Sequence, residues 1–239
     1  MPISEQTVSY RDRDIPLTGL LYWNPALSGR RPGVLLVHGG AGLDDHARDQ
    51  ARRYASLGYA VLACDMLGDG VAGQRERVIA CLTSLRDDPD ALVRRAMAGL
   101  AVLADCPHAD GRFAAAGFCF GGMTALALAR SGQQLAGVIS IHGSLATSAP
   151  ARPGAVAARV LVCHGSADPH VPLADVTAFA QEMDEAGASW QLIMYGGAQH
   201  GFTHSRAVPG AVAGVAYDVD ADKRSLSAAK AFLAEIFGA

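Results

Sequence analysis

A cysteine framed by glycines is the first place in this sequence where the residue types indicate chemistry. Residues 117–122 read GFCFGG, directly after the apolar run RFAAA and directly before the helix-forming segment MTALALAR. Glycines two positions before and after Cys119 let a strand turn sharply into a helix while the two pass close together. At the start of that helix the positive end of the dipole favours the thiolate over the thiol. The spacing therefore predicts that Cys119 is an activated nucleophile.

A thiol nucleophile needs a general base, and the base needs a group that orients it. Two later segments, HGSADP and GGAQHGF, supply these residue types as Asp168 and His200. Asp168 precedes a proline, which indicates a turn that holds the carboxylate on a loop. His200 lies in a glycine-flanked loop after an apolar run. We predict a triad of Cys119, Asp168 and His200, in the order nucleophile, acid and base.

Acyl transfer also requires N–H donors for the negative charge that develops on the carbonyl oxygen. The backbone N–H of Phe120 is one donor, because it follows the nucleophile directly. We assign the second to Gly40, in the loop after the run GVLLVH, with Gly39 as the other candidate. Candidates for lining the substrate pocket are Gly39, Phe118, His142, Phe202 and His204.

The elements that must position these residues alternate between apolar runs and segments of helical periodicity. Strands are predicted at 33–38, 59–65, 112–118, 135–143, 159–165 and 189–197, and helices near 44–57, 89–104, from about 120, 173–187 and 223–237. Two shorter strands within 7–22 alternate more and fit an antiparallel edge. Segments 144–158 and 204–224 are predicted to be surface loops. Strands that are apolar throughout are typical of a parallel sheet buried on both faces, where ligands bind at the carboxyl ends of the strands.

Length and composition favour one globular α/β domain over residues 1–239. The chain is 50% hydrophobic and has a net charge of −3. No basic cluster indicates nucleic acid or an anionic membrane surface, so a small molecule is the expected partner. We find no signal-peptide pattern and no apolar run of about 18 residues, which favours a cytoplasmic location. The five cysteines contain no C-x-x-C pair and are expected to be free thiols.

Two other kinds of site are not supported by the spacing. His200 and His204 are four residues apart, as in a zinc-binding helix, but Gly201 occupies the position where that motif has Glu. The run Gly39-Gly40-Ala41-Gly42 does not have the spacing of a phosphate-binding or dinucleotide-binding loop. We therefore predict neither a metal nor a cofactor.

Nearly the whole chain resembles the dienelactone hydrolase family of cysteine-nucleophile α/β-hydrolases. The resemblance rests on residues 38–70, the Cys119 turn, and residues 163–172, 196–204 and 217–233. It implies an α/β-hydrolase fold, with a mostly parallel central sheet, helices on both faces and an antiparallel N-terminal edge. It also implies that Cys119 is the nucleophile, His200 the base and Asp168 its orienting acid, with Gly40 and Phe120 as oxyanion donors.

The sequence departs from this family at two positions. The family often has Glu directly after the residue that matches His38, where it is thought to hold or exchange the resting thiol proton, but here the residue is Gly39. His200 would then take the thiol proton directly. Dienelactone-cleaving members also place an arginine four residues after the catalytic histidine, but here that residue is His204, and Arg206 follows two positions later.

The function we expect is cleavage of a small ester, a dienelactone-like lactone or a thioester through a thioester acyl-enzyme, by a monomer or a homodimer. The alternative is a non-catalytic scaffold that binds a ligand or senses oxidants through a reactive Cys119.

Overall fold

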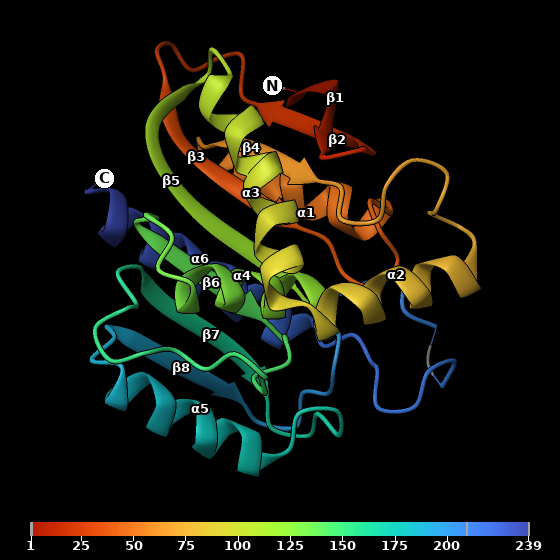
Figure 1. The fold of residues 1–239 in the computed structure, drawn as a ribbon, viewed down its shortest axis with the longest axis vertical. Helices are drawn as coiled ribbons and strands as arrows, with labels where there is room; N and C mark the ends of the chain where they lie inside the picture. Colours follow the sequence, from red (N-terminus) through yellow and green to blue (C-terminus); the bar gives the residue numbers. More distant parts are fainter. Residues whose placement is uncertain (1, 209, 239) are drawn as a thin grey trace.

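The computed structural model describes residues 2–208 and 210–238, which build one eight-stranded sheet between two layers of helices (Figure 1). The strand order is β1-β2-β4-β3-β5-β6-β7-β8. Strands β3 to β8 run parallel to their neighbours, whereas β1 pairs antiparallel with β2 and β2 antiparallel with β4. This arrangement confirms the predicted α/β-hydrolase fold and its antiparallel N-terminal edge.

The elements follow the predicted alternation closely. The strands are β1 (Ser4–Asp12), β2 (Ile15–Trp23), β3 (Arg31–Val37), β4 (Ala60–Cys64), β5 (Ala109–Phe118), β6 (Gly137–Ile141), β7 (Arg159–Gly165) and β8 (Trp190–Tyr195). The helices are α1 (Asp45–Ser56), α2 (Arg75–Asp87), α3 (Pro89–Asp105), α4 (Phe120–Arg130), α5 (Leu173–Glu185) and α6 (Val219–Phe237).

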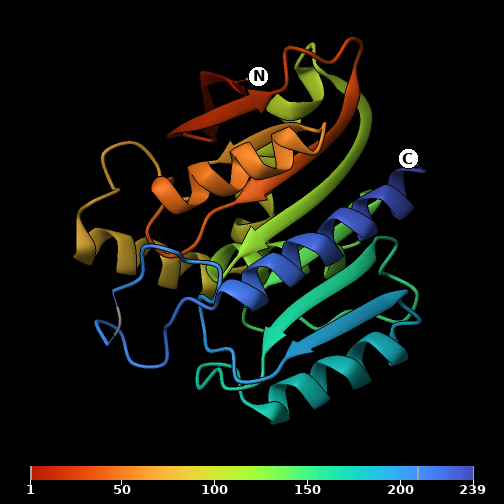
Figure 2. The same ribbon diagram turned by 180° about the vertical axis from the view of Figure 1, so that it is seen from behind.

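The sheet is buried on both faces, which explains why its central strands are apolar at every position. Helices α3, α4 and α5 cover one face, and the view from behind shows α1 and α6 across the other (Figure 2). Successive side chains of a strand point to opposite faces. In β3, Leu35 and Val37 therefore pack in the cluster that includes α3, α4 and α5, and Val34 and Leu36 pack with α1 and α6. Within the described residues, no helix combines the length and apolar character that crossing a membrane requires.

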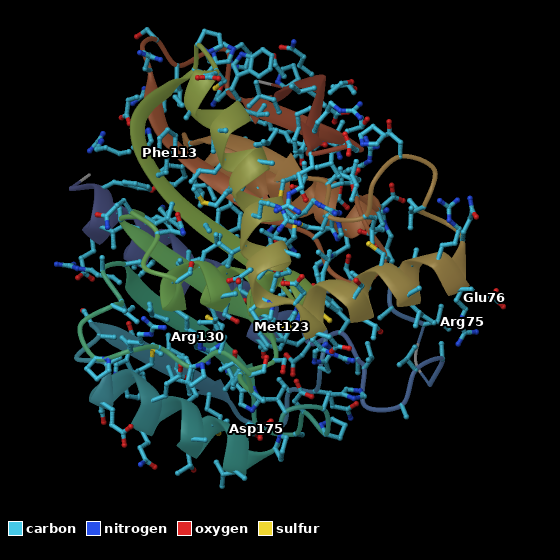
Figure 3. The ribbon with its side chains drawn as sticks, in the orientation of Figure 1. Arg75, Glu76, Phe113, Met123, Arg130 and Asp175 are labelled. Atoms are coloured by element: carbon cyan, nitrogen blue, oxygen red, sulfur yellow. The ribbon has the colours of Figure 1, made fainter. Side chains whose placement is uncertain are left out.

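Two helices differ from the prediction. Helix α2 was not predicted, because Leu85 is its only buried residue and no apolar stripe marks it in the sequence. Arg75 and Glu76 at its beginning point away from the body of the molecule (Figure 3). Helix α6 begins at Val219 and not near residue 223, since the carboxylate of Asp218 accepts hydrogen bonds from the backbone N–H groups of Asp220 and Ala221. The loop predicted over 204–224 therefore ends at Asp218.

The turn from β5 into α4 brings three backbone segments into close contact. Cys119 lies at this turn with φ 55° and ψ −115°, a conformation that is costly for any residue with a side chain. A Cβ atom on Gly117 would overlap the carbonyl group of Gly121, and one on Gly121 would overlap the carbonyl group of Val37. Glycine is required at both positions because backbone occupies the space that a side chain would need.

We predict that Gly117→Ala lowers the free energy of unfolding by about 3 kcal/mol, because the added methyl group forces the strand and the helix apart. Denaturant titration measures this loss. The control is Gly196→Ala, since Gly196 is exposed and a Cβ atom added to it would have no heavy atom within 4 Å. The control should change stability by less than about 0.5 kcal/mol. Equal stability of the two variants would contradict the packing explanation.

Candidate active site

The structure brings Cys119, His200 and Asp168 together at the carboxyl ends of β5, β8 and β7. His200 Nε2 lies 3.1 Å from Cys119 Sγ, and His200 Nδ1 lies 2.8 Å from Asp168 Oδ2. The three strands run parallel, so the loops that follow them meet at one edge of the sheet. The side chains form one hydrogen-bonded line from the carboxylate through the imidazole to the thiol.

Asp168 is held so that it fixes the orientation of the imidazole. Its second oxygen, Oδ1, accepts the backbone N–H of His170 at 2.8 Å. Burial raises the pKa of Asp168, but the hydrogen bond and charge of His200 and the N–H of His170 outweigh burial, so the net pKa lies below its ordinary value. The ionised carboxylate keeps the proton of His200 on Nδ1 and turns Nε2 toward the thiol.

The contact between Cys119 and His200 favours a thiolate beside an imidazolium. Burial raises the pKa of Cys119, but the hydrogen bond and charge of His200 and the N–H groups of Phe120 and Gly40 together lower the pKa below that of an ordinary thiol. Burial lowers the pKa of His200, whereas Asp168 and Cys119 raise it to about 10. The opposite directions of the two pKa shifts draw the shared proton toward His200 and favour the thiolate form of Cys119.

The N–H groups of Phe120 and Gly40, which the sequence predicts as oxyanion donors, both contribute to the lowered pKa of the Cys119 thiol. The carbonyl of Gly39 explains why Gly40 and not Gly39 faces the thiol. His38 is buried and accepts the N–H of Met66 on Nε2 at 3.0 Å, so its Nδ1 carries the proton and donates to the Gly39 carbonyl at 2.6 Å. The Gly39 C=O and the Gly40 N–H belong to one trans peptide group and point in opposite directions, so the Gly40 N–H points away from His38. His38, which was not assigned a role from the sequence, thus orients the donor at Gly40.

Three residues proposed as pocket lining lie in the interior instead. Phe118 and Phe202 are 1% and 0% exposed, and His142 is 2% exposed. Because side chains alternate along β5, the turn that presents Cys119 directs Phe118 into the core. Both ring nitrogens of His142 are engaged, by the Cys119 N–H and by Thr203. These three residues therefore pack beneath the site and do not line a substrate pocket.

The other two pocket candidates lie at the edge of the site. A Cβ atom on Gly39 would lie 3.7 Å from Cys119 Cβ, which is ordinary van der Waals contact. Since Gly39 has no side chain, no carboxylate competes with His200 for the thiol proton at this position. The imidazole of His204 is partly exposed, stacks on His46 at 4.6 Å and lies 3.5 Å from the carboxylate of Asp44. Arg206, two residues later, pairs with Asp45 and Asp49 of α1.

A groove of about 490 Å³ lies beside α4, between the junction of α2 and α3 and residues 144–148. Met123, one helical turn after Cys119, lines it, and both Met123 and Arg130 lie along α4 in Figure 3. Arg130 donates to the carbonyl of Leu145 at 2.8 Å and forms a bidentate ion pair with Glu182 of α5. The predicted loop at 144–158 thus borders a groove, and a buried arginine fixes where the loop begins.

All five cysteines are free thiols, and only Cys81 and Cys119 are partly exposed. In the part of the chain that the structure describes, no group of three or more His, Cys, Asp or Glu side chains has the geometry of a metal site.

The loop after His204 holds the backbone of His200 on both sides. The His200 N–H donates to the Gly214 carbonyl at 3.0 Å, and the Ala216 N–H donates to the His200 carbonyl at 3.1 Å. Gly214 has φ +74°, and a Cβ atom on it would overlap the ring of Pro169, next to Asp168. The position of His200 therefore depends on a glycine that packs against Pro169, the residue after Asp168.

We predict that Gly214→Ala displaces the loop and lowers the reactivity of Cys119 toward iodoacetamide at pH 7 by about tenfold or more, since the thiolate depends on the position of His200. Gly197→Ala is the matched control. Gly197 has a similar φ of +76° but no neighbour within 4 Å of a Cβ position. If both variants behave alike, the contact with Pro169 does not position the base.

The pH dependence of alkylation tests the assignment of the proton. We expect the midpoint for Cys119 to lie below the ordinary thiol range in the wild type and to rise in His200→Gln, because that change removes the positive charge that stabilises the thiolate. Peptide mass spectrometry measures alkylation of each cysteine. Cys81 serves as the internal reference, since burial raises the pKa of its thiol. An unchanged midpoint in His200→Gln would show that His200 does not stabilise the thiolate.

Comparisons with known proteins agree with this architecture. The family model described as "Dienelactone hydrolase family" matches residues 18–237. A solved structure designated m3DLH is 38% identical, covers 98% of both chains and has a TM-score of 0.91. A dienelactone hydrolase-like promiscuous phosphotriesterase from metagenomic libraries is 35% identical, covers 99% of both chains and also has a TM-score of 0.91.

One curated relative, an uncharacterized protein of Caenorhabditis elegans, is 37% identical over 146 residues, which are 60% of this chain and 92% of that protein. The extent of the family match and the similarity in sequence and fold across nearly the whole chain lead to one conclusion: the chain belongs to the dienelactone hydrolase family, a family of hydrolases.

Proposed function

We propose that this protein hydrolyses a small carboxylic ester, lactone or thioester with Cys119 as the nucleophile. The observation that carries the proposal is the line from Asp168 through His200 to Cys119, with distances of 2.8 and 3.1 Å. Two N–H donors, from Gly40 and Phe120, act on the same thiol. This is the arrangement that acyl transfer requires, with nucleophile, base, orienting acid and oxyanion donors in one place.

In the first half-reaction the Cys119 thiolate attacks the carbonyl carbon and forms a C–S bond. The carbonyl oxygen becomes an oxyanion, and the N–H groups of Gly40 and Phe120 stabilise it. When the oxyanion collapses, the bond to the leaving oxygen breaks, and His200 Nε2 donates its proton to that oxygen. The alcohol leaves, and the acyl group remains on Cys119 as a thioester.

In the second half-reaction a water molecule gives a proton to His200 Nε2 and attacks the thioester carbonyl. The same two N–H groups stabilise the second oxyanion. Its collapse breaks the C–S bond, releases the carboxylic acid and returns the thiolate beside the protonated imidazole. Ester and water are thereby converted to acid and alcohol, and the enzyme returns to its starting state.

In the resting state of this mechanism Cys119 is a thiolate and His200 carries the proton. Gly39 has no side chain beside Cys119, so no carboxylate at this position competes with His200 for the thiol proton. The groove lined by Met123 and Ser144 is our candidate for holding part of the substrate. Met123 follows Cys119 by four residues on α4, and Ser144 follows His142 by two.

We also propose that residues 1–239 form a single domain. All of the sheet and both helix layers, from Ser4 to Phe237, belong to it.

A phosphotriester is a second candidate substrate. The relative named as a promiscuous phosphotriesterase is 35% identical over 99% of both chains. The Cys119 thiolate would attack phosphorus while the P–O bond to the leaving group breaks, and His200 Nε2 would donate its proton to that oxygen. Water activated by His200 would then break the S–P bond and release the phosphodiester, with the N–H groups of Gly40 and Phe120 stabilising the charge on the phosphoryl oxygen in both steps. The proposal for this chain is that the same triad serves both reactions.

Turnover of p-nitrophenyl acetate, a small lactone and a dialkyl p-nitrophenyl phosphate tests both proposals. We expect Cys119→Ala and His200→Ala to lower kcat/KM on the accepted substrates by about 10³-fold or more, because each removes an essential part of one unit. Cys81→Ala, which removes the other partly exposed thiol, is the matched control and should retain wild-type turnover. Equal turnover by the wild type and Cys119→Ala would refute the mechanism.

Mass spectrometry separates catalysis from the alternative, a ligand-binding or oxidant-sensing scaffold. An enzyme that works through Cys119 forms an acyl adduct on that residue which then hydrolyses. A sensor would keep a reactive Cys119 without turnover and would oxidise with peroxide. A sensor that forms a disulfide would need a second thiol, and Cys163 on β7 is completely buried, with its pKa raised by burial to about 11. It is therefore poorly suited to rapid thiol exchange.

A further inference from the structure

A chain of buried polar groups lies behind the candidate nucleophile and contains none of the three triad residues. The backbone N–H of Cys119 is shared between the Ile141 carbonyl at 3.0 Å and His142 Nδ1 at 3.2 Å. His142 Nε2 lies 2.9 Å from Thr203 Oγ1, and His46 Nε2 lies 3.0 Å from the same hydroxyl. His142 and Thr203 are 2% and 3% exposed. We call His142, Thr203 and His46 the buried relay.

Donor and acceptor chemistry assigns the hydrogens that lie between the members of the buried relay. A backbone N–H can only donate, so His142 Nδ1 accepts and the imidazole carries its hydrogen on Nε2. That N–H donates to Thr203 Oγ1, which leaves the single hydroxyl hydrogen to donate to His46 Nε2. Burial lowers the pKa of His142 well below its ordinary value, and burial and the charge of His204 lower that of His46 to about 4. Both rings are therefore neutral, as this pattern requires.

The first contact of the buried relay joins two strained residues. Cys119 has φ 55° and His142 has φ 42°, and they are two of the three non-glycine residues with positive φ in the described chain. Such conformations are costly for residues that carry a side chain and persist only where surrounding contacts hold them. The bond from the Cys119 N–H to His142 Nδ1 is one such contact, and it acts on the backbone that directs the thiol.

The second contact, between His142 Nε2 and Thr203 Oγ1, joins His142 to the loop that carries His200. Thr203 follows His200 by three residues, in a turn closed by the bond from the His204 N–H to the Gly201 carbonyl at 2.8 Å. One hydroxyl thus links this turn to the nucleophile through His142 and to α1 through His46. The separation of Cys119 and His200 therefore depends on these buried contacts as well as on the hydrogen bond between their own side chains.

We propose that Thr203 and His142 are positioning residues that hold the Cys119 turn and the His200 loop at the distance needed for proton transfer. This inference rests on the proposed function, because it assigns these residues to the same reaction. His142 accepts the backbone N–H of Cys119 and packs its ring against that of His200 at 5.3 Å, and Thr203 lies in the His200 loop, but neither forms a hydrogen bond to Cys119 Sγ or to a ring nitrogen of His200. Thr203 belongs to the His200 loop, and its hydroxyl bonds to His142, which in turn accepts the Cys119 N–H.

The matched pair Thr203→Val and Thr203→Ser tests the inference. Valine keeps the shape of threonine and removes the hydroxyl, whereas serine keeps the hydroxyl. We expect Thr203→Val to lower kcat on p-nitrophenyl acetate by about 10- to 100-fold with little change in KM, since a small displacement of the base slows the chemical step. The pH midpoint for alkylation of Cys119 should rise. Thr203→Ser should restore both toward wild type.

A second pair covers the case in which Thr203→Val does not fold. His142→Asn tolerates the positive φ and places an amide oxygen where Nδ1 accepts the Cys119 N–H. His142→Phe keeps the ring but removes the acceptor. We expect Cys119 in the asparagine variant to be alkylated at lower pH than in the phenylalanine variant. Equal midpoints in these two variants would overturn the inference.

Alkylation and turnover together separate this inference from the proposed function. If Thr203→Val shifts the alkylation midpoint but wild-type turnover does not need Cys119, the relay positions the thiol and the proposed function fails. If turnover needs Cys119 but folded Thr203→Val matches the wild type in kcat and in midpoint, the proposed function stands and the inference is wrong. Failure of folded Thr203→Ser to recover either quantity would also overturn the inference, because the hydroxyl would then not be the group responsible.

Discussion

The contact of 3.1 Å between His200 Nε2 and Cys119 Sγ is the interaction on which the site depends. It joins a group whose pKa is lowered to one whose pKa is raised, so each favours the charged form of the other. Opposite charges at this separation attract strongly where water is largely excluded. The strained turn at Cys119, the carboxylate of Asp168 and the loop around Gly214 all keep these two atoms together.

Histidines around the site fall into two groups according to whether a carboxylate faces them. Asp168 faces His200 and Asp44 faces His204, and the pKa of each of these imidazoles is raised. His142 and His38 are buried without such a partner, and burial lowers their pKa. Burial alone favours the neutral ring, and only a hydrogen-bonded acid reverses that preference.

The neutral histidines orient peptide groups, whereas His200 is the one placed to transfer a proton. His38 donates to the Gly39 carbonyl and so turns the N–H of Gly40 toward the thiol. His142 accepts the N–H of Cys119 and fixes the turn that carries the thiol. Protonation of either ring would turn its acceptor nitrogen into a donor that faces another donor. Their burial is therefore part of how the site is built.

Much of the fold could be read from the sequence because it depends on local patterns. The apolar strands, the antiparallel edge and the turn at Gly117 and Gly121 follow from side-chain periodicity and from the absence of Cβ atoms. Helix α2 was missed for the same reason, since it buries only Leu85 and shows no periodic stripe. Cys119, Asp168 and His200 were predicted as a triad because their residue types and chain order suit one reaction; the structure brings them into hydrogen-bond contact, and their catalytic roles stay a prediction.

The sequence by itself determined that a strand must turn sharply into a helix at Cys119, and it predicted which residues would act as nucleophile, base and acid. Only the tertiary structure decided which side chains face the site, so Phe118, Phe202 and His142 pack beneath it. The buried relay also lay outside the reach of the sequence, because residues 46, 142 and 203 belong to three separate segments. Local patterns specify local backbone geometry, whereas contacts between distant segments exist only after the order and direction of the strands have brought their ends to one edge of the sheet.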